Sequence, residues 1–203
     1  MEPVASLDQY RLSAARRYRR DRSRPMFYFD LASPHTYLAA ERADRMFARL
    51  EWCPASSDAL QCSTHVEHEE RAIIARRATL LGLPLVWPIG PSAPVVGAMR
   101  VAALAAERGV GAPFVLAASR LAFCGGFDID EPEILAEAAA AAGIELGEVL
   151  QAAGDAGRDG PIEDAARRLL AAGADRLPAL QVGRMLFCGE DRLSEAVAAR
   201  ASA

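Results

Sequence analysis

Strand-like segments occur near both ends of this chain, and the long stretch between them is patterned as helices. The apolar runs short enough to be strands are residues 26–30, 50–53, 179–182 and 185–188. A helical pattern at 35–49 joins the first two strands, which predicts that they are parallel. Only two residues separate the last two strands, so we expect a hairpin, followed by a helix at 193–201. Segments distant in sequence therefore share one sheet.

The stretch between the strand pairs contains several helical patterns bounded by glycine and proline. The predicted helices are residues 67–81, 95–108, 114–123, 132–142, 146–153 and 161–172. The order βαβ, helical block, ββα predicts an α/β protein with a thioredoxin fold (βαβ…ββα) and a large α-helical insertion. We expect three parts, namely a basic N-terminal arm at 1–25, a thioredoxin-like domain from 26–56 and 174–203, and a helical insertion domain at 57–173.

The charge of the chain excludes some partners. The formal net charge is −4, from 23 basic and 27 acidic residues, which gives no reason to expect nucleic acid. The basic residues are all arginine, so lysine chemistry is excluded. Seven arginines fall within residues 1–25, where a helix at 7–20 is predicted. A solvated arm and an anion-binding segment are both compatible with this run.

The cysteines predict a reducing compartment. They stand at Cys53, Cys62, Cys124 and Cys188, with no Cys-x-x-Cys pair and no spacing typical of a disulfide framework. No apolar run is long enough to span a membrane, and the N-terminus lacks a signal-peptide core, so we expect a cytoplasmic protein with no membrane partner. Cys62, His65 and His68 lack a nearby fourth ligand, so no metal site is predicted.

The first candidate site is the start of the helix after the first strand. The sequence there reads Ser33-Pro34-His35-Thr36. Free N–H groups and the helix dipole stabilise an anion such as a thiolate at this position. Serine and threonine stand where a redox thioredoxin has its cysteines, so Ser33 is predicted to donate to the thiolate of a ligand. His35 is a candidate general base. Simple capping by Ser33 and an exposed His35 remain alternatives.

Two further motifs face this helix in the predicted topology. Leu177-Pro178 precedes the third strand, where a thioredoxin fold has a cis-proline, and the residue before it offers its backbone to a peptide-like ligand. Glu190-Asp191 stands at the start of the last helix, where Asp191 is able to accept an α-amino group. An ordinary strand-start proline and simple helix capping are the alternatives. Cys188 is interpreted as a strand residue rather than a nucleophile.

Together these motifs resemble the DsbA-like family, and within it 2-hydroxychromene-2-carboxylate isomerase and the kappa-class glutathione transferases. The resemblance runs from Met26 to the C-terminus. It is carried by residues 27–37 (Phe-Tyr-Phe-Asp-x-x-Ser-Pro-x-x-Tyr), 82–85, 127–130, 177–178 and 189–192. It implies that Ser33 is the catalytic serine that hydrogen-bonds the glutathione sulfur. It also implies roles in glutathione binding for the backbone at Leu177 and Pro178 and for Glu190 and Asp191 at the γ-glutamyl end.

The resemblance implies an enzyme that uses glutathione or another low-molecular-weight thiol. Its implied activity is that of an isomerase or transferase acting on a small conjugated, aromatic acid, with the helical insertion as the substrate wall and a homodimer as the assembly. In such isomerases the thiolate adds to a double bond, rotation follows, and elimination regenerates the thiol.

The chain departs from this family at several positions. It has no Asn within residues 91–95, no lysine, and unusual residues at His35 and Glu190. A non-catalytic binding protein on the same scaffold is therefore an open alternative. A third alternative, a disulfide oxidoreductase, conflicts with the absence of cysteine at Ser33 and Thr36.

Overall fold

The computed structural model describes residues 24–62, 66, 68–88 and 94–201. The predicted helix at 7–20, and with it most of the basic arm, lies outside the described residues. So do His65 and most of the 91–95 segment, and the side chain of His68 is not described either.

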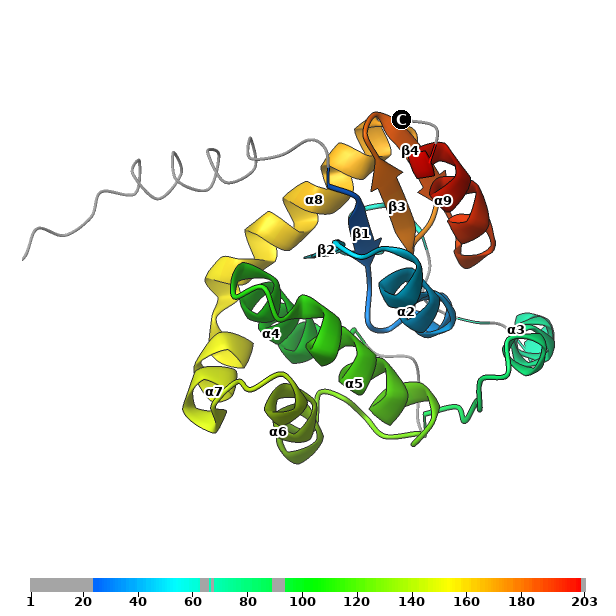
Figure 1. Cartoon of the computed structure of the whole chain (residues 1–203). Helices are drawn as coiled ribbons and strands as arrows, with labels where there is room; N and C mark the ends of the chain where they lie inside the picture. Colours follow the sequence, from blue (N-terminus) through cyan, green and yellow to red (C-terminus); the bar gives the residue numbers. More distant parts are fainter. Residues whose placement is uncertain (1–23, 63–65, 67, 89–93, 202–203) are drawn as a thin grey trace, which may run out of the picture.

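The strands form one mixed sheet within the described residues. They are β1 (Met26–Phe29), β2 (Glu51–Pro54), β3 (Ala179–Val182) and β4 (Met185–Cys188), in the order β2-β1-β3-β4. The helix α2 (Pro34–Met46) connects β1 to its parallel neighbour β2, while β3 runs antiparallel to both β1 and β4 (Figure 1). Both predicted pairings are confirmed, and the two ends of the chain share this sheet.

The predicted helical block is also present. Its helices are α3 (His68–Leu80), α4 (Val96–Glu107), α5 (Gly111–Phe123), α6 (Pro132–Ala141), α7 (Leu146–Gly154), the 3-10 turn η1 (Ala156–Arg158) and α8 (Asp159–Ala171). The chain ends with the 3-10 turn η2 (Glu190–Arg192) and α9 (Leu193–Ala201).

Some helix boundaries differ from those predicted. The helices α5 and α8 begin three and two residues earlier than predicted, because Pro113 and Pro161 lie within their first turns, where a missing N–H costs nothing. Conversely, α2 ends three residues before 49, because Phe47 adopts an extended conformation (φ −123°, ψ 109°) and its side chain is buried.

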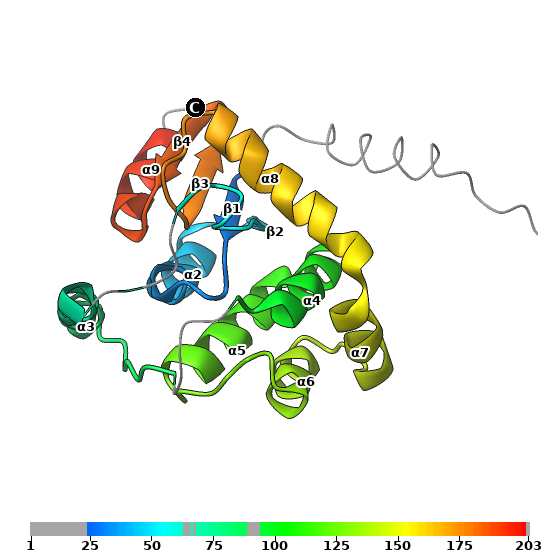
Figure 2. The same ribbon diagram turned by 180° about the vertical axis from the view of Figure 1, so that it is seen from behind.

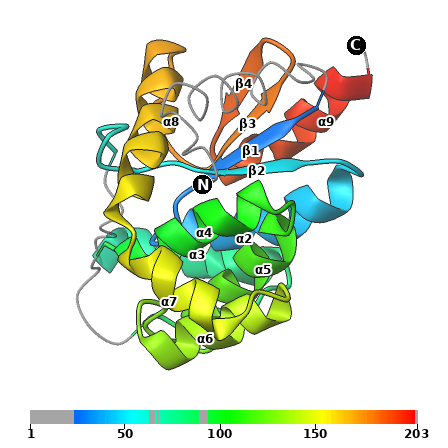
Figure 3. The same ribbon diagram turned by 90° about the vertical axis from the view of Figure 1, so that its left-hand side faces the viewer.

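Alternate residues of each strand face opposite sides of the sheet. Phe27 and Phe29 point into the larger core with α2, α4, α5 and α9, whereas Tyr28 points toward α8. Figure 2 shows α8 and α9 on opposite sides of the sheet. Figure 3 shows α4 to α7 gathered along the side of β2, against which α4 and α5 pack. The sheet is thus covered on both faces, and the helical block shares its core.

Trp52 on β2 connects the sheet to the helical block. Its ring meets that of Phe27 edge-on, with 4.9 Å between centroids. The first residue of α5, Gly111, lies directly against it, so that a Cβ at Gly111 would stand 2.8 Å from the Trp52 Cβ. This contact leaves no room at position 111 for any side chain larger than the hydrogen of glycine.

The structure also bears on two expectations about the chain as a whole. All four cysteines are free thiols. Over the described ranges, no helix combines the length and the apolar character needed to cross a bilayer.

Replacement of Gly111 tests this packing. We expect Gly111→Ala to lower the free energy of unfolding by about 1–3 kcal/mol, because the added methyl group overpacks a tight core contact. Gly160→Ala in α8 is the matched control, since a Cβ there has no atom within 4 Å, and it is expected to be neutral or slightly stabilising. Urea denaturation of both variants measures the difference, and equal stabilities would contradict this view of the Trp52 contact.

Candidate functional site

The candidate site lies where β1 ends and α2 begins. Ser33 occupies the N-cap position of α2 with extended backbone (φ −89°, ψ 123°), and Pro34 follows in the first turn. The Ser33 hydroxyl accepts no capping hydrogen bond. Instead, the Thr36 N–H donates to the Ser33 backbone oxygen at 3.0 Å. Ser33 is only 6% exposed. The hydroxyl therefore stands at the helix start without the capping role that was its simplest alternative.

Asp30 holds the turn that presents Ser33. Its Oδ1 accepts the Ala32 N–H at 3.0 Å and its Oδ2 accepts the Ser57 N–H at 2.9 Å, while its backbone oxygen accepts the Ser33 N–H at 3.1 Å. Asp30 is 8% exposed, and burial raises the pKa of its carboxyl more than these N–H groups lower it. The sequence signal for this role is an Asp directly after a buried strand, a typical turn residue.

The predicted cis-proline is confirmed at Leu177-Pro178. The Pro178 oxygen accepts the Gly189 N–H at 2.8 Å, which ties this turn to the end of β4. The backbone N–H of Leu177 lies close enough to the Cys62 thiol to lower its pKa. The backbone group that was expected to meet a ligand thus has a thiol of this chain beside it.

Cys62 brings a thiol to this side of the site, a placement that sequence reasoning missed because it treated Cys62 only as a metal ligand. The Cys62 N–H donates to the Ser57 oxygen at 3.0 Å, and the thiol also contacts the Ser57 side chain. Burial raises the pKa of the Cys62 thiol more than these hydrogen bonds lower it. Hydrogen bonds from the Ser57 N–H to Asp30 and from the Cys62 N–H to the Ser57 oxygen connect the turn before Ser33 to Cys62.

Glu190 lies in a buried cluster with two arginines. Arg42 of α2 donates to Glu190 Oε2 at 2.7 Å and to its backbone oxygen at 3.1 Å, and Arg77 of α3 donates to Oε1 at 2.7 Å. Glu190 is 7% exposed, and the two arginines neutralise its charge within the protein. Asp191 beside it is exposed. In the sequence Arg42 and Arg77 look like ordinary surface residues, and no local pattern predicts this cluster.

His35 lies in the first turn of α2 and turns toward α3. Its Nε2 stands 3.6 Å from Glu70 Oε1, and about a third of its side chain is exposed. His35 and Glu190 therefore both contact α3, through Glu70 and Arg77 respectively.

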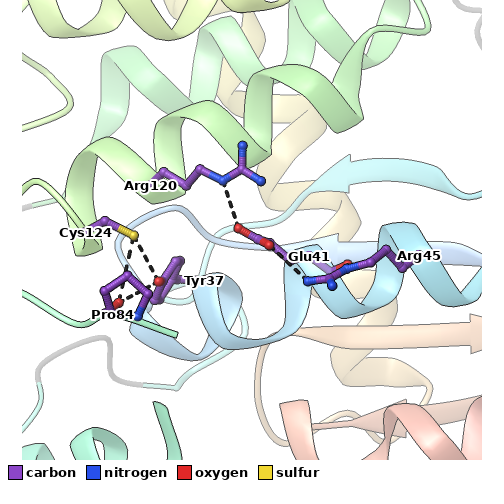
Figure 4. Close-up of polar contacts among 6 residues, drawn as sticks. All are labelled: Tyr37, Glu41, Arg45, Pro84, Arg120 and Cys124. Carbon is purple, nitrogen blue, oxygen red and sulfur yellow. Dashed lines mark hydrogen bonds and ion pairs between the residues drawn. The ribbon is translucent and has the colours of Figure 1, made fainter. Parts of the chain in front are cut away.

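Two residues after His35 on α2, Tyr37 fixes the segment that follows α3. Its hydroxyl donates to the Pro84 oxygen at 2.6 Å and lies 2.9 Å from Cys124 Sγ at the end of α5 (Figure 4). Burial raises the pKa of the Tyr37 phenol, which keeps the hydroxyl protonated as the donor. Glu41, on the same helix, accepts from Arg120 of α5 at 2.8 Å. These contacts hold α2, and with it Ser33, against the helical block.

A cavity of about 700 Å³ opens beside the turn that precedes Ser33, although Ser33 itself is not one of its lining residues. Asp30 and Ala32 line it from the turn before Ser33, and further walls come from residues 56–59 after β2, 94–99 at the start of α4, and α8. A volume of this size is typical of small-molecule sites. Over the part of the chain that the structure describes, no group of His, Cys, Asp and Glu is arranged to hold a metal ion.

Comparison with known proteins agrees with this architecture. Residues 26–199 match a family model described as a DSBA-like thioredoxin domain. The solved structure of 2-hydroxychromene-2-carboxylate isomerase gives a TM-score of 0.75 at 16% identity, covering 88% of this chain and 94% of that one. A probable DsbA oxidoreductase from Streptomyces coelicolor gives 0.68 at 19%, covering 88% of each chain. No curated protein matches the sequence.

A third similar structure was solved with GSH. Cytosolic disulfide reductase DsbM from Pseudomonas aeruginosa with GSH gives a TM-score of 0.60 at 20% identity, covering 88% of this chain and 96% of that one. At these identities the similarities establish a shared fold. The resemblance and the fold predicted from the motifs are confirmed at that level.

Replacement of Glu190 tests the buried ion cluster. Glu190→Gln leaves Arg42 and Arg77 without their counter-charge, and we expect the free energy of unfolding to fall by about 1–3 kcal/mol. Asp191→Asn removes the same charge from the exposed neighbour and is expected to stay within about 0.5 kcal/mol of the parent. Denaturant unfolding compares the two, and an equal loss for both variants would show that the cluster has no special weight.

Replacement of Asp30 tests the turn that holds Ser33. Asp30→Ala orphans the N–H groups of Ala32 and Ser57, with an expected loss of about 1–3 kcal/mol, while the exposed Asp58→Ala is expected to change little. Because the folded carboxyl keeps its proton to a higher pH than the unfolded one, Asp30 stabilises the fold most at low pH, and this contribution is lost as the pH rises through the raised pKa. The loss is therefore expected to be larger near about pH 4 than near about pH 7. The opposite trend in denaturation experiments would contradict it.

Proposed function

The chain belongs to the DSBA-like thioredoxin domain family, and from this premise we propose that it is an isomerase or transferase that uses glutathione or another low-molecular-weight thiol. The observation that carries the proposal is the hydroxyl of Ser33, which lies at the start of α2 without a capping hydrogen bond. A hydroxyl at a helix N-terminus suits an incoming thiolate, since both the dipole and the donor stabilise negative charge.

Ser33 has the central role in this proposal. Its hydroxyl donates a hydrogen bond to the sulfur of the bound thiol, and together with the start of α2 it lowers the pKa of that thiol. The protein thereby increases the fraction of thiolate, the reactive form, at neutral pH. When bound, the thiol supplies the nucleophilic sulfur that adds to a conjugated double bond of the acceptor.

The acceptor is assigned to the cavity beside Ser33. Ala32, the residue directly before Ser33, lines this cavity, so that an acceptor held there stands next to the helix start. Met99 of α4 and Ile162 of α8 supply apolar walls for a flat conjugated body. The helical block thus has the role of substrate wall.

The peptide part of the thiol is assigned to Leu177, Pro178 and Asp191. A cysteinyl backbone is assigned to pair with Leu177, beside the Cys62 thiol. Asp191 is exposed and forms no close ion pair with another described residue, so it is assigned to the γ-glutamyl amino group, while Arg77, about a third exposed, is suited to its carboxylate. Glu190 positions Arg77 and contributes no direct contact to the thiol.

Two similarities support a thiol-dependent enzyme of this kind. The isomerase named above gives a TM-score of 0.75, and DsbM was solved with GSH. Disulfide exchange is disfavoured, because Ser33 and Thr36 stand at the helix start and burial raises the pKa of Cys62. A non-catalytic binding protein is the second candidate, favoured by the Cys62 thiol that lies beside the Leu177 N–H.

Glutathione binding tests the proposal. Saturating reduced glutathione is expected to raise the melting temperature, in line with about 2.7 kcal/mol at a hundred times the dissociation constant. Ser33→Ala is expected to keep the fold and to reduce turnover of a conjugated acceptor by about a hundredfold, because one donor to the developing anion is lost. Ultraviolet absorbance of the bound thiolate at neutral pH is expected to fall as well.

Ser194→Ala, on the exposed side of α9, is the matched control and is expected to behave as the parent. Stabilisation by glutathione without any turnover would favour the non-catalytic alternative. Unchanged thiolate absorbance in Ser33→Ala would remove the proposed role of the hydroxyl, and insulin reduction by the parent chain would support disulfide exchange instead.

A further inference from the structure

We propose that the cavity beside Ser33 selects acceptors that carry positive charge or hydrogen-bond donors, and that it discriminates against carboxylates. The inference deepens the proposed function, on which it rests only for the statement that an acceptor occupies this cavity. It changes the expected substrate class, because the family resemblance alone implies an acid.

The charged residues that line the cavity are mainly acidic. They are Asp30, Asp58, Asp159, Glu163 and Arg167. Four carboxyl groups thus face one guanidinium. The local balance is therefore negative from the turn before Ser33 to α8.

Contacts within the walls leave part of this charge uncompensated. Arg100 binds Asp159 with two hydrogen bonds of 2.7 Å, which neutralises that carboxylate. Arg167 is divided between Glu163, at 3.1 Å, and Asp164, at 2.7 Å, so one cation serves two carboxylates. Among the residues with described positions, no arginine pairs with Asp58, which is exposed.

Asp30 adds an inward-facing acceptor to the same wall. Each of its two carboxyl oxygens accepts one backbone N–H. A carboxyl group has more than two lone pairs, so Asp30 is able to accept a further hydrogen bond from a ligand. A carboxylate placed here meets the like charge of the exposed Asp58 and Glu163 carboxylates, which line the same cavity. A cationic or donor-bearing group meets the opposite situation.

The remaining lining is apolar and fits the body of the same ligand. Val95, Val96 and Met99 come from the start of α4, and Ile162 comes from α8. These side chains stack against a flat apolar ring while the acidic groups meet its polar substituent. The acceptor class that this cavity favours is a conjugated or aromatic compound with an amine, amidine or hydroxyl donor.

Three isosteric probes test the charge preference without requiring the natural substrate. Benzamidine, benzamide and benzoate have the same planar shape and carry positive, zero and negative charge. We expect their dissociation constants, measured by calorimetry on the full chain at neutral pH and low salt, to increase in that order. Benzamidine is expected to bind at least about tenfold more tightly than benzoate, a difference of about 1.4 kcal/mol.

Charge-neutralising variants locate the effect. Asp58→Asn combined with Glu163→Gln removes the lining carboxylates that make no structural bridge between elements, and we expect the benzamidine-to-benzoate preference to fall at least about threefold. Glu133→Gln combined with Glu137→Gln changes the net charge equally on the exposed side of α6 and is expected to retain the parent preference.

Two results would overturn the inference. One is tighter binding of benzoate than of benzamidine, and the other is no saturable binding of any of the three probes. If both double variants lost the preference for benzamidine equally, its cause would be the net charge of the protein rather than the cavity. The probes are measured without thiol, so a failure here is distinguishable from a failure of glutathione to bind, which tests the proposed function.

Discussion

The site depends on a single buried carboxyl group. Asp30 receives hydrogen bonds from the turn that leads into α2 and from the loop that leaves β2, and it does so at the point where both segments leave the sheet. These bonds extend the connection that the Ala55 N–H makes to the Phe29 oxygen at 2.9 Å, and they carry it from the sheet into the turn and the loop. The position of Ser33, the near wall of the cavity and the loop that brings Cys62 to Leu177 all follow from this arrangement.

Most of the fold could be predicted from the sequence, because its strands, helices and turns are specified by local or periodic patterns. The short apolar and aromatic run at residues 26–30 indicated a buried strand, and the two-residue connection at Gly183-Arg184 indicated the hairpin. The order of the segments was sufficient to identify the fold and the cis-proline at Pro178. Helix starts were less accurate, since α5 and α8 begin at Gly111 and Asp159, before the predicted residues 114 and 161.

The site was accessible only in part. Ser33 stood out because its position in a helix start has a defined chemical meaning. The partners of Glu190 did not, because Arg42 and Arg77 lie more than a hundred residues away in sequence and have no distinguishing spacing. The same holds for Cys62 and Leu177. Contacts of this kind are consequences of the tertiary fold, which a sequence pattern does not encode.

The attachment of α3 has a consequence for how this molecule opens. Arg77 binds it to the body through an ion pair with Glu190, and its apolar contact is limited to residues such as Ile74, while Ile73 and Leu80 remain exposed. The helices α4 to α7 are held by a continuous apolar core instead. Rising ionic strength weakens the first kind of attachment and spares the second. Amide hydrogen exchange in α3 is therefore governed by local detachment, on a faster timescale than exchange in the rest of the molecule.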